Sequence, residues 1–203
     1  GIRVIQPDED LGPATKVLFA ADDLSGTDTD LIYCDDDRLY APEWFENMIA
    51  ARGDRKNIAV APSVLHHVEK LGILAPSRHG PFPKLRTTPL HVLKLLKRKI
   101  KQAALGKTDA KPHRKLKYSR TGYAHIAEGL GGVLIKPDFI DKSMFDIPQI
   151  LWTVDDVWLS GHFERKDIAI MCPKGFGTPP ETGAALEAAL CRSVIEGANR
   201  VEA

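Results

Sequence analysis

Three consecutive aspartates, Asp35, Asp36 and Asp37, follow the apolar run TDLIYC at residues 29–34, and their carboxylates repel one another. A hard divalent cation such as Mg²⁺ or Mn²⁺ relieves that repulsion, because it prefers oxygen ligands and takes carboxylates together with the phosphate oxygens of a substrate. Successive residues of an extended chain point to opposite sides, so Asp35 and Asp37 can form a D-x-D pair while Asp36 faces away. The alternative is a solvated acidic turn. The cluster alone leaves both interpretations open.

A second acidic pair, Asp155 and Asp156, lies at the start of the segment VDDVWLSGHFERK. As a structural feature, the pair would favour a helix start, with Thr153 as the cap and Asp156 completing an approximate capping box. As a functional feature, a carboxylate held against Trp152 or Trp158 would have its pKa raised by desolvation. A raised pKa suits a general base that takes a proton from a hydroxyl near neutral pH.

Between the two acidic groups lies the glycine-rich stretch EGLGG at residues 128–132. Its glycines indicate either a bulge or tight turn, or a place where a sugar or phosphate approaches the backbone. The chain contains neither G-x-G-x-x-G between a strand and a helix nor G-x-x-x-x-G-K-[ST]. The sequence therefore excludes dinucleotide-binding oxidoreductases and P-loop enzymes.

The elements that would position these residues alternate between strands and helices. We predict strands at 2–6, 29–34, 57–63 and 168–173, helices at 13–22, 42–52, 154–166 and 181–201, and a strand or hairpin with a glycine break over 123–140. Strands alternating with helices at these intervals predict βαβ units and an α/β fold with a mostly parallel sheet. Ligands of such sheets bind at the carboxyl ends of strands, which is where the three aspartates lie.

A basic segment interrupts this pattern. Residues 84–120 hold 13 of the 28 Lys and Arg residues but only one of the 27 acidic residues, and 90–105 reads as an amphipathic helix. We interpret about 70–120 as an insertion in a single domain. Its helix suits an anionic membrane surface, or it packs its apolar stripe on the same domain. Nucleic acid is a third option, disfavoured because few aromatic side chains flank the segment.

Composition sets the remaining bounds. With 203 residues, 43% of them hydrophobic, the chain can bury one sizeable core or two small ones. It has no apolar run of about 18 residues and no export signal. Three widely spaced cysteines are typical of reduced thiols. These features predict a cytoplasmic protein, with contact to the inner face of the membrane through residues 84–120 as an option.

The order of four segments, LGPATKVLFA, DLIYCDDDRLYAPEWF, EGLGGVLIKPDF and VDDVWLSGHFERKDIAI, resembles a nucleotide-sugar glycosyltransferase of the GT-A fold, of the bacterial family-two type or a near relative. The resemblance covers residues 1 to about 173 without the basic insertion. It implies a single GT-A-like catalytic domain over 1–203. Because such enzymes begin with the strands and loop that hold the nucleotide base, it also implies an N-terminally truncated domain.

The resemblance also implies roles for individual residues. Asp37 would be the direct ligand of Mn²⁺ or Mg²⁺, and Asp35 would bind both the metal and the ribose or sugar of a UDP or GDP sugar donor. Asp156 would be the general base of an inverting transfer to an acceptor hydroxyl, with Asp155 as its partner. Lys16 would reach the donor phosphates. Gly131 and Gly132 would line the donor or acceptor pocket.

The activity implied is that of a metal-dependent, hexosyltransferase-like enzyme of polysaccharide biosynthesis, with a sugar, lipid-linked or polysaccharide acceptor. Two other classes of function stay open. One is a metal-dependent phosphoryl-transfer enzyme or nuclease, with Asp35, Asp37, Asp155 and Asp156 around two metals. The other is a non-catalytic binding module, in which both acidic pairs serve only as turns and caps.

Overall fold

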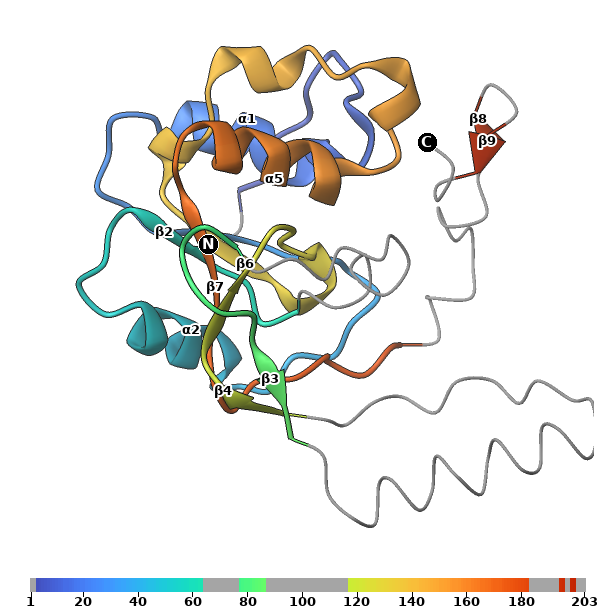
Figure 1. The fold of residues 1–203 in the computed structure, drawn as a ribbon. Helices are drawn as coiled ribbons and strands as arrows, with labels where there is room; N and C mark the ends of the chain where they lie inside the picture. Colours follow the sequence, from blue (N-terminus) through green and yellow to red (C-terminus); the bar gives the residue numbers. More distant parts are fainter. Residues whose placement is uncertain (1–2, 64–76, 87–116, 183–193, 196–197, 200–203) are drawn as a thin grey trace, which may run out of the picture.

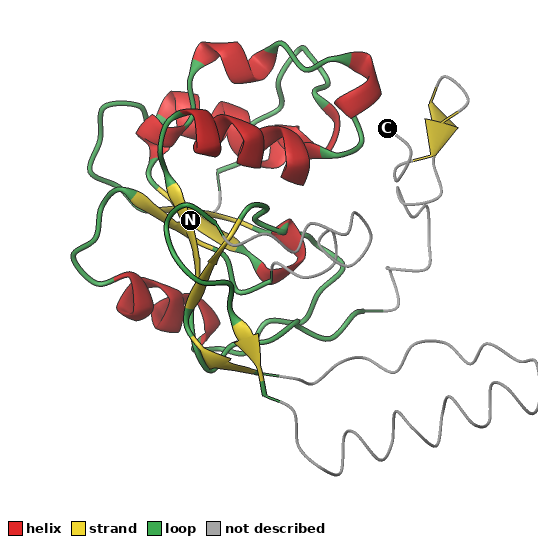
Figure 2. Ribbon diagram, viewed as in Figure 1, coloured by secondary structure: helices red, strands yellow, loops and turns green. Residues whose placement is uncertain are grey.

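The protein has a mixed α/β architecture in which helices cover both faces of an open five-stranded sheet (Figure 1, Figure 2). The computed structural model describes residues 3–63, 77–86, 117–182, 194–195 and 198–199. In Figure 1, helices α1 (Thr15–Asp23) and α5 (Asp155–Arg165) lie on one face of the sheet, and α2 (Trp44–Arg52) lies on the other. Each of these helices was predicted from the sequence.

Strands β1 (Leu31–Tyr33), β2 (Ile58–Val60), β5 (Gly122–Ala124), β6 (Val133–Ile135) and β7 (Ala169–Cys172) form this sheet in the order β1-β6-β2-β7-β5. Only β2 and β7 pair in parallel, and the other three pairings are antiparallel. The prediction of a mostly parallel sheet is therefore wrong.

The reason is the position of β6, which lies between β1 and β2 and runs opposite to both. The chain enters β6 from the glycine turn η2 (Gly129–Gly131) rather than from a crossover helix, so it does not form the βαβ unit that alternation predicts. Strands β1, β2 and β7 nevertheless point the same way. Their carboxyl ends therefore share one edge of the sheet, as the sequence predicted.

Helix α1 begins after a short 3₁₀ turn, η1 (Gly12–Ala14), which contains Pro13. Proline is tolerated there because the first backbone N–H groups of a helix have no intrahelical partner. Helix α2 ends at Gly53, whose positive φ of 59° suits a residue without a β-carbon. Three further 3₁₀ turns connect β6 to α5, namely η3 (Pro137–Phe139), η4 (Lys142–Phe145) and η5 (Gln149–Leu151).

The hydrophobic core lies between the helices and the sheet. All three residues of β6 are fully buried, and Leu18 of α1, Met48 of α2 and Phe163 of α5 have no exposed surface. Burying such a side chain completely stabilises a fold by about 1.5–3 kcal/mol. The core thus holds α1 and α5 firmly over the end of β1. Within the described residues, no helix is long and apolar enough to pass through a lipid bilayer.

Two small sheets lie outside this unit. Strand β3 (Lys84–Leu85) pairs with β4 (Tyr118–Arg120), so the two ends of the basic segment lie side by side, as an insertion requires. The helix predicted at 90–105 falls outside the described residues. Strand β8 (Val194–Ile195) pairs with β9 (Ala198–Asn199), so the helix predicted over 181–201 is wrong at those four residues. The strand predicted at 2–6 is also wrong, because residues 3–6 are irregular.

Candidate functional site

The candidate site lies at the carboxyl end of β1, where the first turns of α1 and α5 meet the glycine turn η2. It brings together Lys16 from α1, Asp35 from the loop after β1, Gly129 from η2, and the pair Asp155 and Asp156 from α5. Four segments that are far apart in the sequence thus supply one cluster of charged side chains, the Lys16 cluster, which we define by these five residues.

Lys16 bridges two of the carboxylates. Its Nζ lies 2.7 Å from Oδ1 of Asp35 and 3.0 Å from Oδ2 of Asp155. The side chains of Lys16 and Asp35 are 23% and 33% exposed, whereas that of Asp155 is 2% exposed. The cluster therefore has a partly open side formed by Lys16 and Asp35, and a buried side formed by the acids of α5.

Gly129 permits the close approach of these groups. Its N–H donates a hydrogen bond of 3.0 Å to Oδ1 of Asp156, and its carbonyl accepts one of 3.3 Å from the N–H of Asp35. A β-carbon on Gly129 would lie 2.7 Å from Lys16 Nζ and 2.8 Å from Asp35 Oδ1. The cluster therefore cannot form in this way around a residue with a side chain.

The other glycines of EGLGG serve the turn. A β-carbon on Gly131 would lie 2.7 Å from the backbone nitrogen of Ser63, and Gly132 has a φ of 74° and lies against the ring of Phe45. The N–H of Gly132 donates a hydrogen bond of 2.8 Å to the carbonyl of Gly129, but neither glycine makes a described contact with a charged side chain of the Lys16 cluster. Gly129, which the sequence interpretation did not single out, occupies the position expected for them.

The start of α5 differs from the predicted capping box. Val154 is the N-cap residue and no side chain caps the helix, so the proposed role of Thr153 is wrong. Asp155 and Asp156 lie in the first turn, where the helix dipole favours negative charge. Their carboxylates point to Lys16 and to Gly129. The acids are therefore fixed by tertiary contacts rather than by a local cap.

Burial and charge shift the proton affinities in the cluster. Burial, and then the neighbouring Asp156 carboxylate, raise the pKa of Asp155, against the opposing effect of Lys16. Burial alone would lower the pKa of Lys16, but the carboxylates of Asp155, Asp156 and Asp35 together raise it above its ordinary value. Lys16 therefore stays an ammonium ion, while Asp155 keeps its proton to higher pH than an exposed aspartate does.

The two tryptophans suggested as the desolvating groups make other contacts. A β-carbon on Gly12 would lie 2.8 Å from the ring of Trp152, which shows how closely this indole covers η1. The Nε1–H of Trp158 donates to the carbonyl of Met144, and its ring packs edge-on against His162. The direction of the Asp155 shift agrees with the prediction, although no described contact links it to these indoles.

Tyr33, the last residue of β1, lies beside the cluster and was missed by the sequence interpretation. It is 3% exposed, and within the described part of the chain its hydroxyl has no hydrogen-bond partner. Lys16 Nζ lies 5.7 Å from the centre of its ring. Burial, followed by the charges of Asp156, Asp155 and Asp35, raises its pKa, so the phenol stays neutral. Tyr33 could have been identified from its spacing of two residues from Asp35, since alternate residues of an extended strand lie on the same face.

Asp37 is engaged elsewhere. Its carboxylate accepts a hydrogen bond of 3.1 Å from Arg38, which also pairs with Glu181, and its carbonyl accepts one of 2.8 Å from Thr182. Asp36 is exposed, as predicted. Across the described residues, no group of three or more His, Cys, Asp or Glu side chains is arranged to hold a metal ion. Asp35 and Asp37 thus contact different cationic side chains.

Polar side chains hold the acidic loop and the glycine turn together. The hydroxyl of Tyr40 donates to the carbonyls of Asp35 and Leu130, at 3.2 and 3.3 Å, and Nε1–H of Trp44 donates to that of Gly131 at 2.8 Å. Ser63, just beyond β2, donates a hydrogen bond of 2.6 Å to the fully buried carboxylate of Glu128. The turn is therefore fixed to both β1 and β2.

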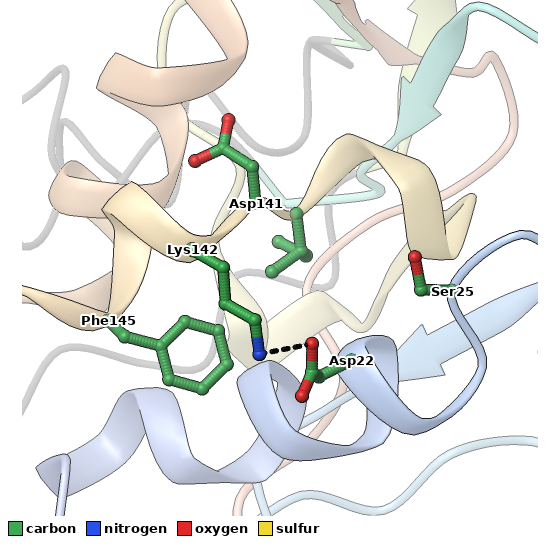
Figure 3. A pocket seen from close by; sticks show the side chains of 6 residues that line it. Asp22, Ser25, Asp141, Lys142 and Phe145 are labelled. Atoms are coloured by element: carbon green, nitrogen blue, oxygen red, sulfur yellow. Dashed lines mark ion pairs between the residues drawn. The ribbon is translucent and has the colours of Figure 1, made fainter.

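A hollow of about 240 Å³ lies away from this cluster, between the end of α1 and η4 (Figure 3). Its lining consists of Asp22, Ser25, Ile140, Asp141, Lys142 and Phe145. Lys142 points to Asp22, with 2.6 Å between their charged atoms. None of the predicted site residues lines this hollow, and its ion pair is largely exposed to solvent, so it offers no group activated for chemistry.

The carboxylates of Asp35 and Asp155 hold the ammonium group of Lys16, and Asp155, whose pKa is raised, accepts a proton more readily than an exposed aspartate does. No protein-family model, curated protein or solved structure matches this chain. Its function therefore has to be inferred from the residues and their geometry.

Proposed function

We propose that the Lys16 cluster is the active site of a metal-dependent nucleotide-sugar glycosyltransferase, which moves a sugar from a UDP or GDP donor to an acceptor hydroxyl with inversion. One observation carries this proposal. Lys16, Asp35 and Asp156, from three of the segments that support the resemblance, lie within 3.3 Å of the position of a β-carbon on Gly129, which comes from the fourth segment.

The convergence is informative because simple structural roles do not require it. A solvated acidic turn at Asp35 and a helix cap at Asp155 would each be satisfied locally. Instead, one lysine contacts both acids across the end of β1, and burial raises the pKa of Asp155. Strongly shifted ionisable groups that cluster at the carboxyl end of strands are typical of functional sites.

The positions of the side chains suggest a division of roles. Asp35 and Lys16, on the partly open side, would face the donor diphosphate, and a bound Mn²⁺ or Mg²⁺ would supply positive charge to the departing nucleoside diphosphate. Asp156, oriented by the N–H of Gly129, would take the proton of the acceptor hydroxyl as its oxygen attacks the anomeric carbon. Asp155 would hold Lys16 and share the proton of the acidic pair.

The proposal includes a GT-A domain, which fits a sheet whose strands β1, β2 and β7 end at the same edge. The acceptor proposed is a sugar, lipid-linked or polysaccharide hydroxyl. Peripheral contact with an anionic membrane through residues 84–120 is also part of the proposal.

Thermal unfolding with nucleoside diphosphates tests the donor site. We expect UDP or GDP to raise the Tm in the presence of Mn²⁺ and to have no effect in EDTA, because the acidic cluster repels a diphosphate without an added cation. Equal stabilisation with and without the metal would contradict a metal-dependent donor site. No stabilisation by any nucleoside diphosphate would remove the support for a donor site in this chain.

Release of nucleoside diphosphate from UDP and GDP sugars, measured with a panel of saccharide acceptors, tests the chemistry. Asp156→Asn should lower the rate by at least about a hundredfold while nucleotide binding is kept, because an amide cannot act as the base. Asp54→Asn, which removes an exposed carboxylate near the end of α2, is the control for the loss of charge. Transfer at the normal rate by Asp156→Asn would show that another group is the base.

A divalent-metal phosphoryl-transfer enzyme or nuclease is the second candidate. It is favoured by the gathering of Asp35, Asp155 and Asp156 around one lysine. It is disfavoured by Asp37, which pairs with Arg38 instead of joining them. Hydrolysis of bis(p-nitrophenyl) phosphate that depends on Mn²⁺ and on Asp155 would favour this candidate over the first.

A further inference from the structure

We propose that the ammonium group of Lys16 occupies the cation site of this protein, and that a divalent cation binds by displacing it from Asp35 and Asp155. The inference rests on the proposed function only for the nucleotide that would follow the metal, since cation binding can be measured without one. It differs from the D-x-D expectation, in which Asp35 and Asp37 share the metal.

The position of the ammonium group is the first argument. Nζ of Lys16 lies 2.7 Å from Asp35 Oδ1 and 3.0 Å from Asp155 Oδ2. Mg²⁺ binds oxygen at about 2.0–2.1 Å, so the two carboxylates would have to close on an ion by less than about 1 Å each. Lys16 is 23% exposed on a flexible, unbranched side chain, and it can therefore withdraw toward solvent.

The contacts of Asp37 are the second argument. Its carboxylate is held by Arg38 at 3.1 Å, and Arg38 is itself held by Glu181 at 3.0 Å. To join Asp35 on a metal, Asp37 would have to leave this pairing. Asp155, by contrast, already contacts the atom that the metal would replace.

Tyr33 provides an independent indication of a ligand. Its hydroxyl is buried next to these carboxylates, and among the described residues it has no hydrogen-bond partner. An unsatisfied buried hydroxyl costs stability, and phenylalanine would fill the same space without that cost. A divalent cation usually keeps several of its waters. A metal-bound water between the carboxylates and the phenol would supply the missing partner.

The exchange gives Lys16 two uses. Without a metal, its ammonium compensates the buried acids of α5, which would otherwise destabilise the fold. When a metal replaces it, the released ammonium lies at the partly open side of the cluster, where the diphosphate of a donor would bind. Metal binding would thus deliver a second positive charge to the substrate phosphates.

A titration of the full chain with Mn²⁺ tests this proposal without nucleotide. The electron paramagnetic resonance signal of the free ion measures how much Mn²⁺ is bound. Lys16→Met should bind Mn²⁺ at least tenfold more tightly than the unaltered protein, because the competing cation is gone. Asp35→Asn and Asp155→Asn should each weaken binding at least tenfold. Asp37→Asn should change it less than twofold, as should the matched control Asp36→Asn, which removes the same charge from the same loop.

Two results would overturn the proposal. One is loss of Mn²⁺ binding in Asp37→Asn together with normal binding in Asp155→Asn. The other is Mn²⁺ binding that is no tighter in folded Lys16→Met than in the unaltered protein. Should Lys16→Met not fold, Tyr33→Phe decides the matter, since it removes only a hydroxyl. It should weaken Mn²⁺ binding severalfold without lowering the Tm in EDTA, and unchanged Mn²⁺ binding would then refute the proposal.

Failure of this inference is distinguishable from failure of the proposed function. Mn²⁺ bound through Asp35 and Asp155, with no added effect of UDP or GDP, would leave the cation exchange standing and argue against a glycosyltransferase. Nucleotide binding that needs Mn²⁺ and Asp37, but not Asp155, would leave the glycosyltransferase standing and remove the exchange.

Discussion

Asp28 and Asp30 precede β1 and Asp35 follows it, so the strand has a carboxylate cluster near each of its ends. At the amino end, Arg52 forms two hydrogen bonds to Asp30, at 2.6 and 2.7 Å. Lys136 contacts both aspartates, and Lys56 contacts Asp28. There, three cationic side chains face two carboxylates, and the Lys56–Asp28 pair is largely exposed whereas Arg52 is buried. At the carboxyl end, Lys16 contacts Asp35 and Asp155, and the N–H of Gly129 donates a hydrogen bond to Asp156.

The proton affinities at the two ends shift in opposite directions. Hydrogen bonds from Lys56 and Lys136 lower the pKa of Asp28 to about 2, and those from Arg52, and then Lys136, lower the pKa of Asp30. At the other end, burial and the charge of Asp156 raise the pKa of Asp155. At the amino end, the aspartates are therefore stabilised in their charged form by ion pairs. At the carboxyl end, the buried Asp155 holds its proton to higher pH than an exposed aspartate, which is typical of groups at functional sites.

Removing the lysine at each end should show the largest contrast. Lys16→Met should lower the free energy of unfolding by about 3–5 kcal/mol in EDTA, because it removes the ammonium group that contacts the buried carboxylate of Asp155. Lys56→Met should cause no measurable change, since its ion pair is exposed and screened by water and salt. Urea unfolding measures both. Equal losses in the two variants would mean that burial does not separate the two clusters.

A methyl group at Gly129 should have the next largest effect. Gly129→Ala should destabilise the fold by about 1–3 kcal/mol, because its β-carbon would crowd Lys16 and Asp35. Gly161 in α5 is the control, since a β-carbon there meets nothing within 4 Å. Gly161→Ala should stabilise the helix by about 0.5–1 kcal/mol. Thermal unfolding of the two variants provides the measurement. An unchanged Tm in Gly129→Ala would show that Lys16 and Asp35 can move to accommodate the methyl group.

The pH dependence of stability should have opposite signs at the two ends. The folded protein lowers the pKa of Asp30, so the stability that this residue gives is present above its ordinary pKa of 3.8 and is lost as the pH falls below it. The folded protein raises the pKa of Asp155, so stability falls as the pH rises from 3.8 through the shifted value. Removing each charge in turn, by Asp30→Asn and Asp155→Asn, isolates these contributions.

Urea unfolding of both variants between pH 3 and pH 8 provides the measurement. Relative to the unaltered protein, Asp30→Asn should become less stable with rising pH, whereas Asp155→Asn should become more stable. If the free energy of unfolding changed with pH in the same way in both variants, folding would shift the pKa values of the two aspartates in the same direction, contrary to this prediction.

Tyr33→Phe should have the smallest effect on stability. It should leave the free energy of unfolding unchanged or raise it by up to about 1 kcal/mol, because the lost hydroxyl has no partner within the described residues. Tyr118→Phe is the matched control at another buried tyrosine, whose hydroxyl is hydrogen-bonded to the thiol of Cys172. This control should lose about 1 kcal/mol. Calorimetry in EDTA measures the pair, and a loss of that size in Tyr33→Phe would mean that its hydroxyl is already satisfied.

Helices α1, α2 and α5 could be predicted from the sequence because their signals are local, whereas the helix predicted over 181–201 is wrong at residues 194–195 and 198–199. Pro13 near the start of α1 and the apolar spacing within α5 act within a few residues. The pairing of the sheet is not local. Nothing in VLI at residues 133–135 indicates that β6 inserts between β1 and β2, and only the packed sheet determines this. The strand predicted at 2–6 fails for the same reason, because a β-rich composition forms a strand only when a partner is available.

The residues of the candidate site likewise divide into those that local sequence signals identified and those that tertiary contacts select. Asp35, Asp155 and Asp156 were identified from residue types and Lys16 from the resemblance, and the structure brings them together. The pairing of Asp37 with Arg38 depends on residues 180–182, far along the sequence. Similarly, Gly129 rather than Gly131 contacts the charged groups because of how η2 docks on Ser63. Tertiary contacts therefore determine which of several neighbouring residues joins the cluster.

Strand β6 is paired on both sides and fully buried, and it begins two residues after η2. Amides in such a strand exchange with solvent only when the whole domain opens, so they mark its slowest cooperative unit. The glycine turn is the direct continuation of that unit, whereas the Asp36–Arg38 loop is tied to the peripheral residues 180–182. Because Asp35 and Tyr40 hydrogen-bond to this turn, local fluctuations should move residues Asp36–Arg38 more than Asp35. Gly129 then serves as the fixed point from which the geometry of the Lys16 cluster is set.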